Sequence, residues 1–516
     1  MNHLGSQAFF GTAAPEFTLS PAISSPFGPQ PSRCMRGKKF RLPAFGRELS
    51  QRVHDRRHAA WGVTRADMQH LAHVQPTTFA MMKWLAKSPV WVCSVEENLR
   101  ASHGARLYMV VVPAAIEGVA LCAAVAPFVL HRWDMYRWDR DHRDLHVPKG
   151  REHSERLSVL LPVWNEALVI EKKLDDLAKQ ELPLHLLIID SASTDDTMKL
   201  VDGWMASHPK AFAGVETIRM PKRKGKTAAV ILALQHLGQH AEGLICMTDA
   251  DAMLERGCLR RMMQWFADPM VGAVGAVPNR MGGRYDEELH RSTWEAMRLA
   301  ESMVDSTPFL EGSCMMWRPS CLAINDLNPM ANADDAQIAT SIRCRGWRTL
   351  ADPLAQFVDV APGTLEGQRR QKIRRAQGLQ RLLIRQRKQA TAKSQGVFGR
   401  IFRRQFHFHI VAPLALTVAS ATAVLRWGFI ALYGWPATFT LANSLHLGFS
   451  LFEATCVVLW WRSRQGKSSG PLSLVGQWLS SMEWLGRSLI TTARGRSLHQ
   501  WEQHAEVRER IMSVED

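Results

Sequence analysis

The chain has 516 residues, of which 46% are hydrophobic, so its apolar surface is sufficient for two or three domains and excludes a disordered or fibrous protein. The 64 Lys and Arg residues exceed the 48 Asp and Glu residues, which gives a formal charge of +16. This excess favours an anionic partner, such as nucleic acid, anionic lipid or a phosphorylated substrate. The cysteines show no CxxC spacing, which points to neither a disulfide framework nor a zinc site and favours a reducing compartment.

The N-terminal region mixes Ser, Pro and Gly with basic residues over 1–60, without apolar periodicity. We predict a disordered basic arm there. Its prolines would break the amphipathic helix that a transit peptide needs. Residues 61–106 follow as an amphipathic, interfacial region, because Lys83 and Lys87 interrupt its most apolar stretch.

Three apolar stretches are long enough to cross a bilayer: 107–130, 410–433 and 439–461. Basic residues follow the first stretch and flank the other two, so the positive-inside rule predicts that the segment between them faces the cytoplasm. We therefore expect an integral, multi-pass membrane protein. Residues 472–516 contain charges among their tryptophans, which predicts an interfacial helix and a cytosolic tail.

Each predicted span carries one charged residue, namely Glu117, Arg426 or Glu453. Charges inside a membrane are costly and usually face partners in a helix bundle. We expect Arg426 to pair with one of the two glutamates. The alternative is that each charge reaches the membrane surface or marks a span that is wrongly assigned.

Between the spans, residues 150–390 predict an α/β domain. Runs rich in Val, Ile and Leu at 157–163, 185–190, 214–220 and 243–249 each precede a polar loop, and helical patterns follow three of them. Such alternation is typical of a mostly parallel sheet with helices on both faces. In these folds ligands bind at the carboxyl ends of the strands.

Asp249 and Asp251 lie one residue apart at the end of the last of these runs. Two carboxylates so spaced can aim at the same point beyond the sheet. That arrangement suits Mg²⁺ or Mn²⁺ shared with the oxygens of a diphosphate.

Several motifs occur in one order along residues 158–383: LPVWNE at 161–166, IDSASTDDT at 189–197, KGKTA at 224–228, the DAD of 249–251, ADDA at 333–336 and QKIRR at 371–375. In this order they resemble glycosyltransferase family 2, in its membrane-bound branch related to cellulose or hyaluronan synthase-like and polyprenyl-phosphate sugar transferases. The resemblance implies a GT-A fold, a Rossmann-like α/β domain.

By the same resemblance, each motif has a role. The residues expected to bind the nucleotide-sugar are Pro162, Glu166, Asp190, Lys226, Asp249, Gln371 and Arg374, the metal ligands are Asp249 and Asp251, and the acceptor-side residues are Glu311, Gly312 and Asp334. Lys226 would reach the diphosphate at the start of a helix, which favours an anion. Asp335 would be the catalytic base that takes the proton of a hydroxyl acceptor. Either Asp334 or Asp335 could also cap the helix that follows.

Two features bear on the acceptor. Arg375 stands where processive members carry a tryptophan of the acceptor site, which argues against synthesis of a long chain. Arg374 matches the family and can clamp a diphosphate, because guanidinium fits phosphate oxygens in pairs. The basic run 369–387 could instead lie on anionic lipid headgroups.

The sequence thus predicts a membrane-bound, inverting, metal-dependent transferase that moves a sugar from a UDP- or GDP-sugar to a glycan or lipid-linked acceptor. The alternative within this class is a polyprenyl-phosphate glycosyltransferase, whose anionic acceptor needs no base. The alternative from another class is a non-catalytic, basic, membrane-tethered protein that binds nucleic acid, but the composition alone favours it and we expect no nucleic-acid partner.

Overall fold

The computed structural model describes residues 103–150, 155–238, 242–281, 285–360, 364–433, 441–496 and 505–513. All of them fall in one structural unit, Val95–Asp516. The predicted basic arm at 1–60 lies outside these residues, as does the predicted interfacial region at 61–106 except for its end, 103–106.

Eight strands form one sheet in the order β3-β2-β1-β4-β7-β6-β8-β5. Their bounds are β1 (Leu157–Val163), β2 (Leu184–Asp190), β3 (Gly214–Arg219), β4 (Leu244–Thr248), β5 (Met253–Leu254), β6 (Val271–Met281), β7 (Cys314–Trp317) and β8 (Arg348–Val360). The four predicted strands correspond to β1, β2, β3 and β4, which pair in parallel.

The other half of the sheet contains the two strands that run against the rest, β7 and β5, so the sheet is mostly parallel, as predicted, but not wholly so. β7 pairs antiparallel with β4 and with β6, and β5 pairs antiparallel with β8, whereas β6 and β8 are parallel. Thr248 at the end of β4 faces Cys314 at the start of β7. β7 therefore enters the sheet at the edge where β4 leaves it and has to run in the opposite direction, so the sheet is mixed.

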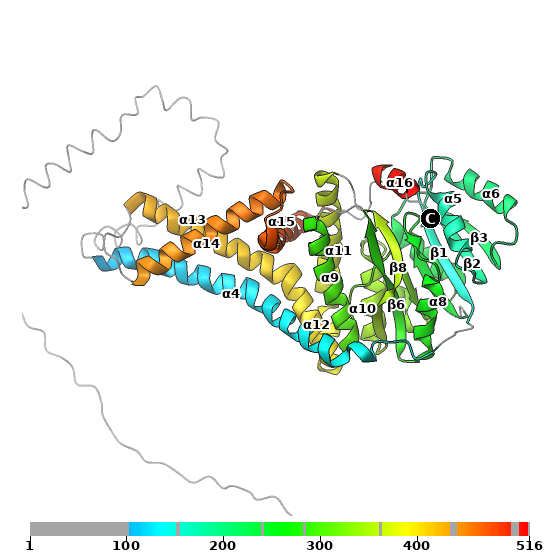
Figure 1. The fold of residues 1–516 in the computed structure, drawn as a ribbon, viewed down its shortest axis with the longest axis horizontal. Helices are drawn as coiled ribbons and strands as arrows, with labels where there is room; N and C mark the ends of the chain where they lie inside the picture. Colours follow the sequence, from blue (N-terminus) through cyan, green and yellow to red (C-terminus); the bar gives the residue numbers. More distant parts are fainter. Residues whose placement is uncertain are drawn as a thin grey trace, which may run out of the picture. The chain divides into compact units, whose positions relative to one another are not determined.

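Helices cover both faces of the sheet, as predicted (Figure 1). Side chains alternate between the faces along β1, because successive residues of a strand point to opposite sides. Val159 and Leu161 belong to the core that contains residues of α5, α6 and α8, and Leu160 belongs to the core that contains residues of α7 and α10. The bounds are α5 (Ile170–Ala178), α6 (Thr197–Ser207), α7 (Lys226–Leu237), α8 (Cys258–Gln264), α9 (Tyr285–Val304), α10 (Asp334–Cys344) and α11 (Leu365–Ala390).

The remaining helices flank this domain along the chain. They are α4 (His103–His142), α12 (Gly396–Phe406), a π-helical turn (His407–Val411), α13 (Ala412–Tyr433), α14 (Leu441–Arg464), α15 (Ser473–Ala493) and α16 (Ala505–Met512). Short 3₁₀ turns lie at Arg143–Leu145, Trp265–Ala267, Pro319–Cys321, Ile324–Asp326, Lys393–Gln395 and Gly470–Leu472. α4 and α13 lie side by side (Figure 1).

Among the described helices, two stretches have the length and apolar composition to cross a membrane: Val111–His142 and Lys393–Leu432. They overlap the spans predicted at 107–130 and 410–433. α14 contains residues 441–461 of the third predicted span, 439–461, but is not one of the two. That third span stays a prediction.

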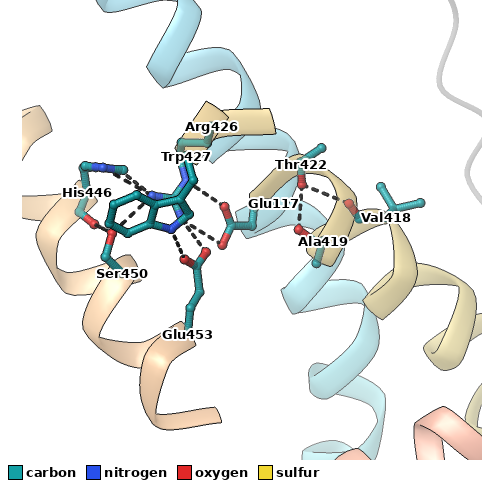
Figure 2. A network of polar contacts seen from close by, with 9 residues as sticks. All are labelled: Glu117, Val418, Ala419, Thr422, Arg426, Trp427, His446, Ser450 and Glu453. Carbon is teal, nitrogen blue, oxygen red and sulfur yellow. Dashed lines mark hydrogen bonds and ion pairs between the residues drawn. The ribbon is translucent and has the colours of Figure 1, made fainter. Parts of the chain in front are cut away.

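A buried ionic cluster joins α4, α13 and α14 (Figure 2). Arg426, which is 0% exposed, donates from Nε to Oε2 of Glu117 at 3.0 Å and contacts Oε1 of Glu453. It also contacts His446, and its Nη1 lies 3.4 Å from Oγ of Ser450. The predicted pairing of Arg426 with a glutamate is confirmed, and both glutamates take part.

Candidate functional site

Two loops at the carboxyl ends of β1 and β2 are tied together. The backbone N–H of Asn165 donates to Oγ of Ser193 at 3.0 Å, and that of Glu166 donates to Oγ1 of Thr197 at 2.7 Å. Asn165 has φ 55°, in the left-handed region that asparagine tolerates better than most residues. Asp190 ends β2, is buried, and accepts the N–H of Ser193 at 2.9 Å. These bonds hold the loop side chains at one edge of the sheet.

An open cleft lies at this edge. It is lined by Pro162, Val163, Trp164, Glu166, Ser191, Arg223, Gly225, Lys226, Ala229, Asp249, Ala250 and Asp251. The cleft therefore brings together the predicted donor residues of three motifs and both predicted metal ligands. Asp190 lies next to it, one residue before Ser191.

Lys226 connects the donor residues with the acidic motif of α10. Its Nζ lies 2.5 Å from Oδ1 of Asp249 and 3.6 Å from Oδ2 of Asp334, and it donates to the carbonyl of Gly312 at 3.0 Å. Burial opposes the charge of this ammonium group, but Asp249 and Asp334 outweigh that effect and raise the pKa of Lys226 above its ordinary value. Lys226 thus stays protonated across the neutral range.

This lysine is placed by the turn before α7. Gly225, the residue that precedes the helix, has φ 92°, which a residue with a side chain rarely adopts. The helix starts at Lys226, so the free N–H groups of its first turn lie beside the cleft. An anion bound there would meet both the ammonium group and the helix N-terminus.

Asp335 contacts Gly312, the same residue whose carbonyl accepts a hydrogen bond from Lys226. Its Oδ2 accepts the N–H of Gly312 at 3.1 Å. A Cβ on Gly312 would stand 3.1 Å from the same oxygen, so a side chain there would push the carboxylate of Asp335 by a few tenths of an ångström. Burial and the neighbouring charge of Asp334 raise the pKa of Asp335 to about 7. A carboxyl group with this pKa can accept and release a proton near neutral pH.

The helix-cap alternative for Asp334 and Asp335 is wrong. α10 starts at Asp334, and the residue in the cap position is Ala333, with φ 63° and no side-chain cap bond. Both aspartates occupy the first turn instead, where the helix dipole favours negative charge.

The remaining predicted residues lie around this centre. Glu311 forms an ion pair with Arg298 on α9. Gln371 and Arg374 are one turn apart on α11, a spacing that puts them on one face of the helix. Burial, followed by the charge of Arg375, lowers the pKa of Arg374 to about 10, with Asp249 acting in the opposite direction. Arg374 thus stays charged at neutral pH.

The sequence analysis missed Arg508, a residue of α16. Its guanidinium donates from Nε to Oε2 of Glu166 and from Nη2 to Oε1, both at 2.6 Å, and both side chains are buried. Burial opposes the charge of Arg508, but Glu166 and, more weakly, Asp251 raise its pKa. Arg508 is one of two arginines in a short amphipathic segment, and no motif marks it.

Asp249 and Asp251 suit a hard cation. Burial and the charge of Asp249 raise the pKa of Asp251, and a cation bound beside the two carboxylates would oppose both effects. Within the described residues no group of three or more His, Cys, Asp or Glu side chains is arranged to hold a metal alone. Mg²⁺ and Mn²⁺ are often held by one or two carboxylates together with substrate phosphates, so these residues fit such an ion.

Comparisons with known proteins agree with this geometry. Residues 158–322 match the family model described as glycosyl transferase family 2. The poly-beta-1,6-N-acetyl-D-glucosamine synthase of Staphylococcus aureus strain COL is 23% identical over 239 residues, which cover 45% of this chain and 56% of that protein. The enzyme of the same name from Staphylococcus epidermidis is 22% identical over 252 residues, with 47% and 59% covered. The chain thus spans little more than half the length of these curated relatives.

Among solved structures, the mannosyltransferase PcManGT from Pyrobaculum calidifontis, in complex with GDP-Man and Mn²⁺, is similar to this chain at a TM-score of 0.58 and 26% identity. The match covers 74% of this chain and 100% of that one. A match at this level supports a shared fold beyond the family segment itself. The chain carries a glycosyltransferase family 2 domain with the GT-A fold.

Proposed function

We propose that this protein is a membrane-bound, metal-dependent, inverting glycosyltransferase that moves a sugar from a UDP- or GDP-sugar to a hydroxyl group of a glycan or lipid-linked acceptor. The observation that carries the proposal is the position of Lys226, within 2.5 Å of Asp249 and 3.6 Å of Asp334. The ammonium group of Lys226 thereby links the residues expected to bind the donor diphosphate to the residues expected to bind the acceptor.

The donor would lie in the cleft with its diphosphate toward Lys226. A diphosphate carries negative charge that the ammonium group and the first turn of α7 can both stabilise. Glu166 and Pro162 also line the cleft, and the nucleoside would lie against them. PcManGT, which was solved in complex with GDP-Man, supports a nucleotide-sugar as the donor class.

The metal ion would be held by Asp249 and Asp251 together with the diphosphate. When bound, it supplies positive charge that stabilises the departing nucleoside diphosphate. Lys226, whose Nζ contacts Asp249, would be near enough to bind a phosphate oxygen of the donor. The Mn²⁺ that accompanies GDP-Man in the PcManGT complex supports a divalent cation.

The chemical step would be a single displacement. The acceptor hydroxyl oxygen forms a bond to the anomeric carbon while the bond from that carbon to the diphosphate oxygen breaks, and the electron pair leaves with the nucleoside diphosphate. Asp335 would take the hydroxyl proton, which suits a carboxylate with a pKa of about 7. Attack from the side opposite the leaving group inverts the configuration of the anomeric carbon.

The apolar helices support membrane attachment. Outward-facing residues of α4 and α13 are well exposed, for example Val119 at 72% and Val424 at 71%, whereas Glu117 and Arg426 are buried between the helices. A soluble protein rarely exposes a large apolar surface while burying its charges. This pattern fits helices that lie in lipid with their polar groups inside the bundle.

The test is a screen of UDP- and GDP-sugars, including UDP-GlcNAc and GDP-mannose, with the detergent-purified protein and Mn²⁺. We expect metal-dependent release of the nucleoside diphosphate from one donor class, and Asp335→Asn should abolish transfer to a hydroxyl acceptor while the protein remains folded. Absence of release with every donor, or unchanged turnover in Asp335→Asn, would overturn the proposal. Activity of that variant on polyprenyl phosphate would favour the phosphate acceptor instead.

Chain length of the product needs its own measurement. The curated relatives are named as synthases of a polymer, whereas Arg375 replaces the tryptophan of processive members and its side chain is exposed. We expect addition of one or few sugars. Sizing of labelled products by gel or mass spectrometry distinguishes short products from a polymer.

A further inference from the structure

The segment that leaves the proposed metal loop is held by side chains of α5. Lys173 donates hydrogen bonds to the carbonyl oxygen of Ala252 and, at 2.8 Å, to Oδ2 of Asp176. The other oxygen of Asp176 accepts the backbone N–H of Leu254 at 2.9 Å. The Lys173–Asp176 ion pair therefore holds the carbonyl of Ala252 and the N–H of Leu254, both within three residues after Asp251.

Gln180 extends this contact by one more turn. Its Nε2 donates to the carbonyl of Glu255 at 3.2 Å, and its Oε1 accepts the N–H of Leu259 at 3.3 Å. Lys173 and Asp176 are three residues apart on one face of α5, and Gln180 lies in the turn that directly follows the helix. We call these three side chains the α5 clamp.

Burial makes this polar face unusual. The side chain of Lys173 is 0% exposed and that of Asp176 is 10% exposed, and the α5 residues around them, such as Ile170 and Leu174, belong to the apolar core. A buried ion pair gives little net stability, because loss of hydration offsets most of the attraction. What the pair does provide is fixed hydrogen-bond geometry for the backbone at 252–254.

That backbone controls where Asp251 points. The N–H of Ala252 donates to the carbonyl of Asp249 at 3.3 Å, which closes a tight turn around the two carboxylates. Met253 and Leu254 form β5, which pairs with β8. Since the turn has only Ala250 and Asp251 between its ends, a shift of Ala252 moves the Asp251 carboxylate with it.

We propose that the α5 clamp is a positioning device that holds Asp251 in place for the divalent cation and so sets the affinity of the metal site. The inference rests on the proposed function, because it assumes that Asp249 and Asp251 bind the ion. α5 also starts at the donor loop, since the N–H of Ile170 donates to the carbonyl of Glu166 at 2.9 Å. The same helix therefore sets the spacing between the donor loop and the metal loop.

The test is Mn²⁺ binding to the detergent-purified full chain, followed by electron paramagnetic resonance in the presence of UDP or GDP. The double variant Lys173→Met/Asp176→Leu removes both charges, so neither is left buried alone. We expect Mn²⁺ affinity to fall about tenfold, as for other residues that orient metal ligands, with a melting temperature close to that of the wild type. Wild-type affinity in the folded double variant would overturn the proposal.

A matched control uses the neighbouring residue on the same helix. Oδ1 of Asp175 accepts Nε1–H of Trp204 on α6 at 2.8 Å, away from the metal loop. Asp175→Ala should lower the melting temperature and leave Mn²⁺ affinity unchanged. An equal loss of affinity in this control would mean that any weakening of α5 acts on the metal, and would overturn the specific role of the clamp.

If the double variant does not fold, Gln180→Ala decides the question. It removes two backbone contacts without introducing a charge, and we expect Mn²⁺ affinity to fall a few-fold; no change would overturn the proposal. Failure of the proposed function is recognised separately, because the wild type itself would then bind neither Mn²⁺ nor nucleoside diphosphate.

Discussion

The guanidinium group of Arg508 holds both carboxylate oxygens of Glu166, with two hydrogen bonds of 2.6 Å between residues that are 342 positions apart. Val507 and Ile511, on either side of Arg508 in α16, pack in the same core as the odd-numbered residues of β1. The C-terminal helix therefore forms part of the wall beside the donor cleft. Glu166, in turn, is held in place by a residue that lies beyond every predicted membrane span.

Removal of Arg508 should destabilise the protein. Arg508→Gln takes the guanidinium away from a carboxylate that is 2% exposed, and breaking a buried pair on one side costs about 3 kcal/mol. The double variant Arg508→Met/Glu166→Met should recover most of that loss, because neither charge remains. Denaturant midpoints of the three proteins in detergent measure this difference. Equal midpoints for Arg508→Gln and the wild type would contradict the role of the pair.

Activity should rise with pH through about 7. Asp335 can act as a base only when it is ionised, and its pKa is raised to about 7 by burial and by Asp334. We expect kcat/KM for a hydroxyl acceptor to fall tenfold per pH unit well below this pKa and to level off above it. The pH profile of the wild type tests this expectation. A profile that is flat between pH 5 and 8 would exclude Asp335 as the base.

The same group should affect stability in the opposite direction. The folded-state pKa of Asp335 is raised from the usual value of 3.8, so the folded protein holds the proton more tightly than the unfolded chain does. Its contribution to the free energy of unfolding is therefore largest at low pH and is lost as the pH rises from about 4 to about 7. Asp335→Asn should show a smaller decline of stability across this range than the wild type, measured by denaturant midpoints.

Metal removal should stop the reaction reversibly. EDTA takes away the cation that we expect at Asp249 and Asp251, and added Mn²⁺ or Mg²⁺ should restore turnover in the wild type. Asp251→Asn should lose at least a hundredfold in turnover and should not recover at high Mn²⁺ concentration. As a control, Glu216→Gln alters an exposed carboxylate that pairs with His236 and should respond to metal like the wild type. Full activity in EDTA would rule out a metal-dependent mechanism.

The buried cluster between α4, α13 and α14 should depend mainly on Arg426 (Figure 2). Arg426→Leu leaves Glu117 and Glu453 facing each other without their shared counter-ion, so we expect a marked drop in melting temperature in detergent. Glu117→Gln should have a smaller effect, because Glu453 still balances the arginine. The order of the two melting temperatures checks this. If Glu117→Gln were the more damaging variant, the arginine would not be the centre of the cluster.

Local sequence patterns predicted the first half of the fold well. The apolar runs that end at Val163, Asp190 and Thr248 became β1, β2 and β4, because a strand buried on both faces needs a continuous run of apolar residues. The family motifs also led to the cleft, where Glu166, Lys226 and Asp251 meet. The catalytic and metal-binding roles assigned to these residues remain predictions.

Tertiary structure decided what no local pattern could encode. β7 lies between β4 and β6 and runs antiparallel to both, which depends on where the chain re-enters the sheet. Lys226 meets Asp334, and Arg508 meets Glu166, across loops of the chain that hydrophobic periodicity does not relate. Periodicity reports which face of an element is buried, whereas the identity of its partners depends on how the elements pack. The sequence alone thus determined the element types and the family, and packing determined which charges stand together in the cleft.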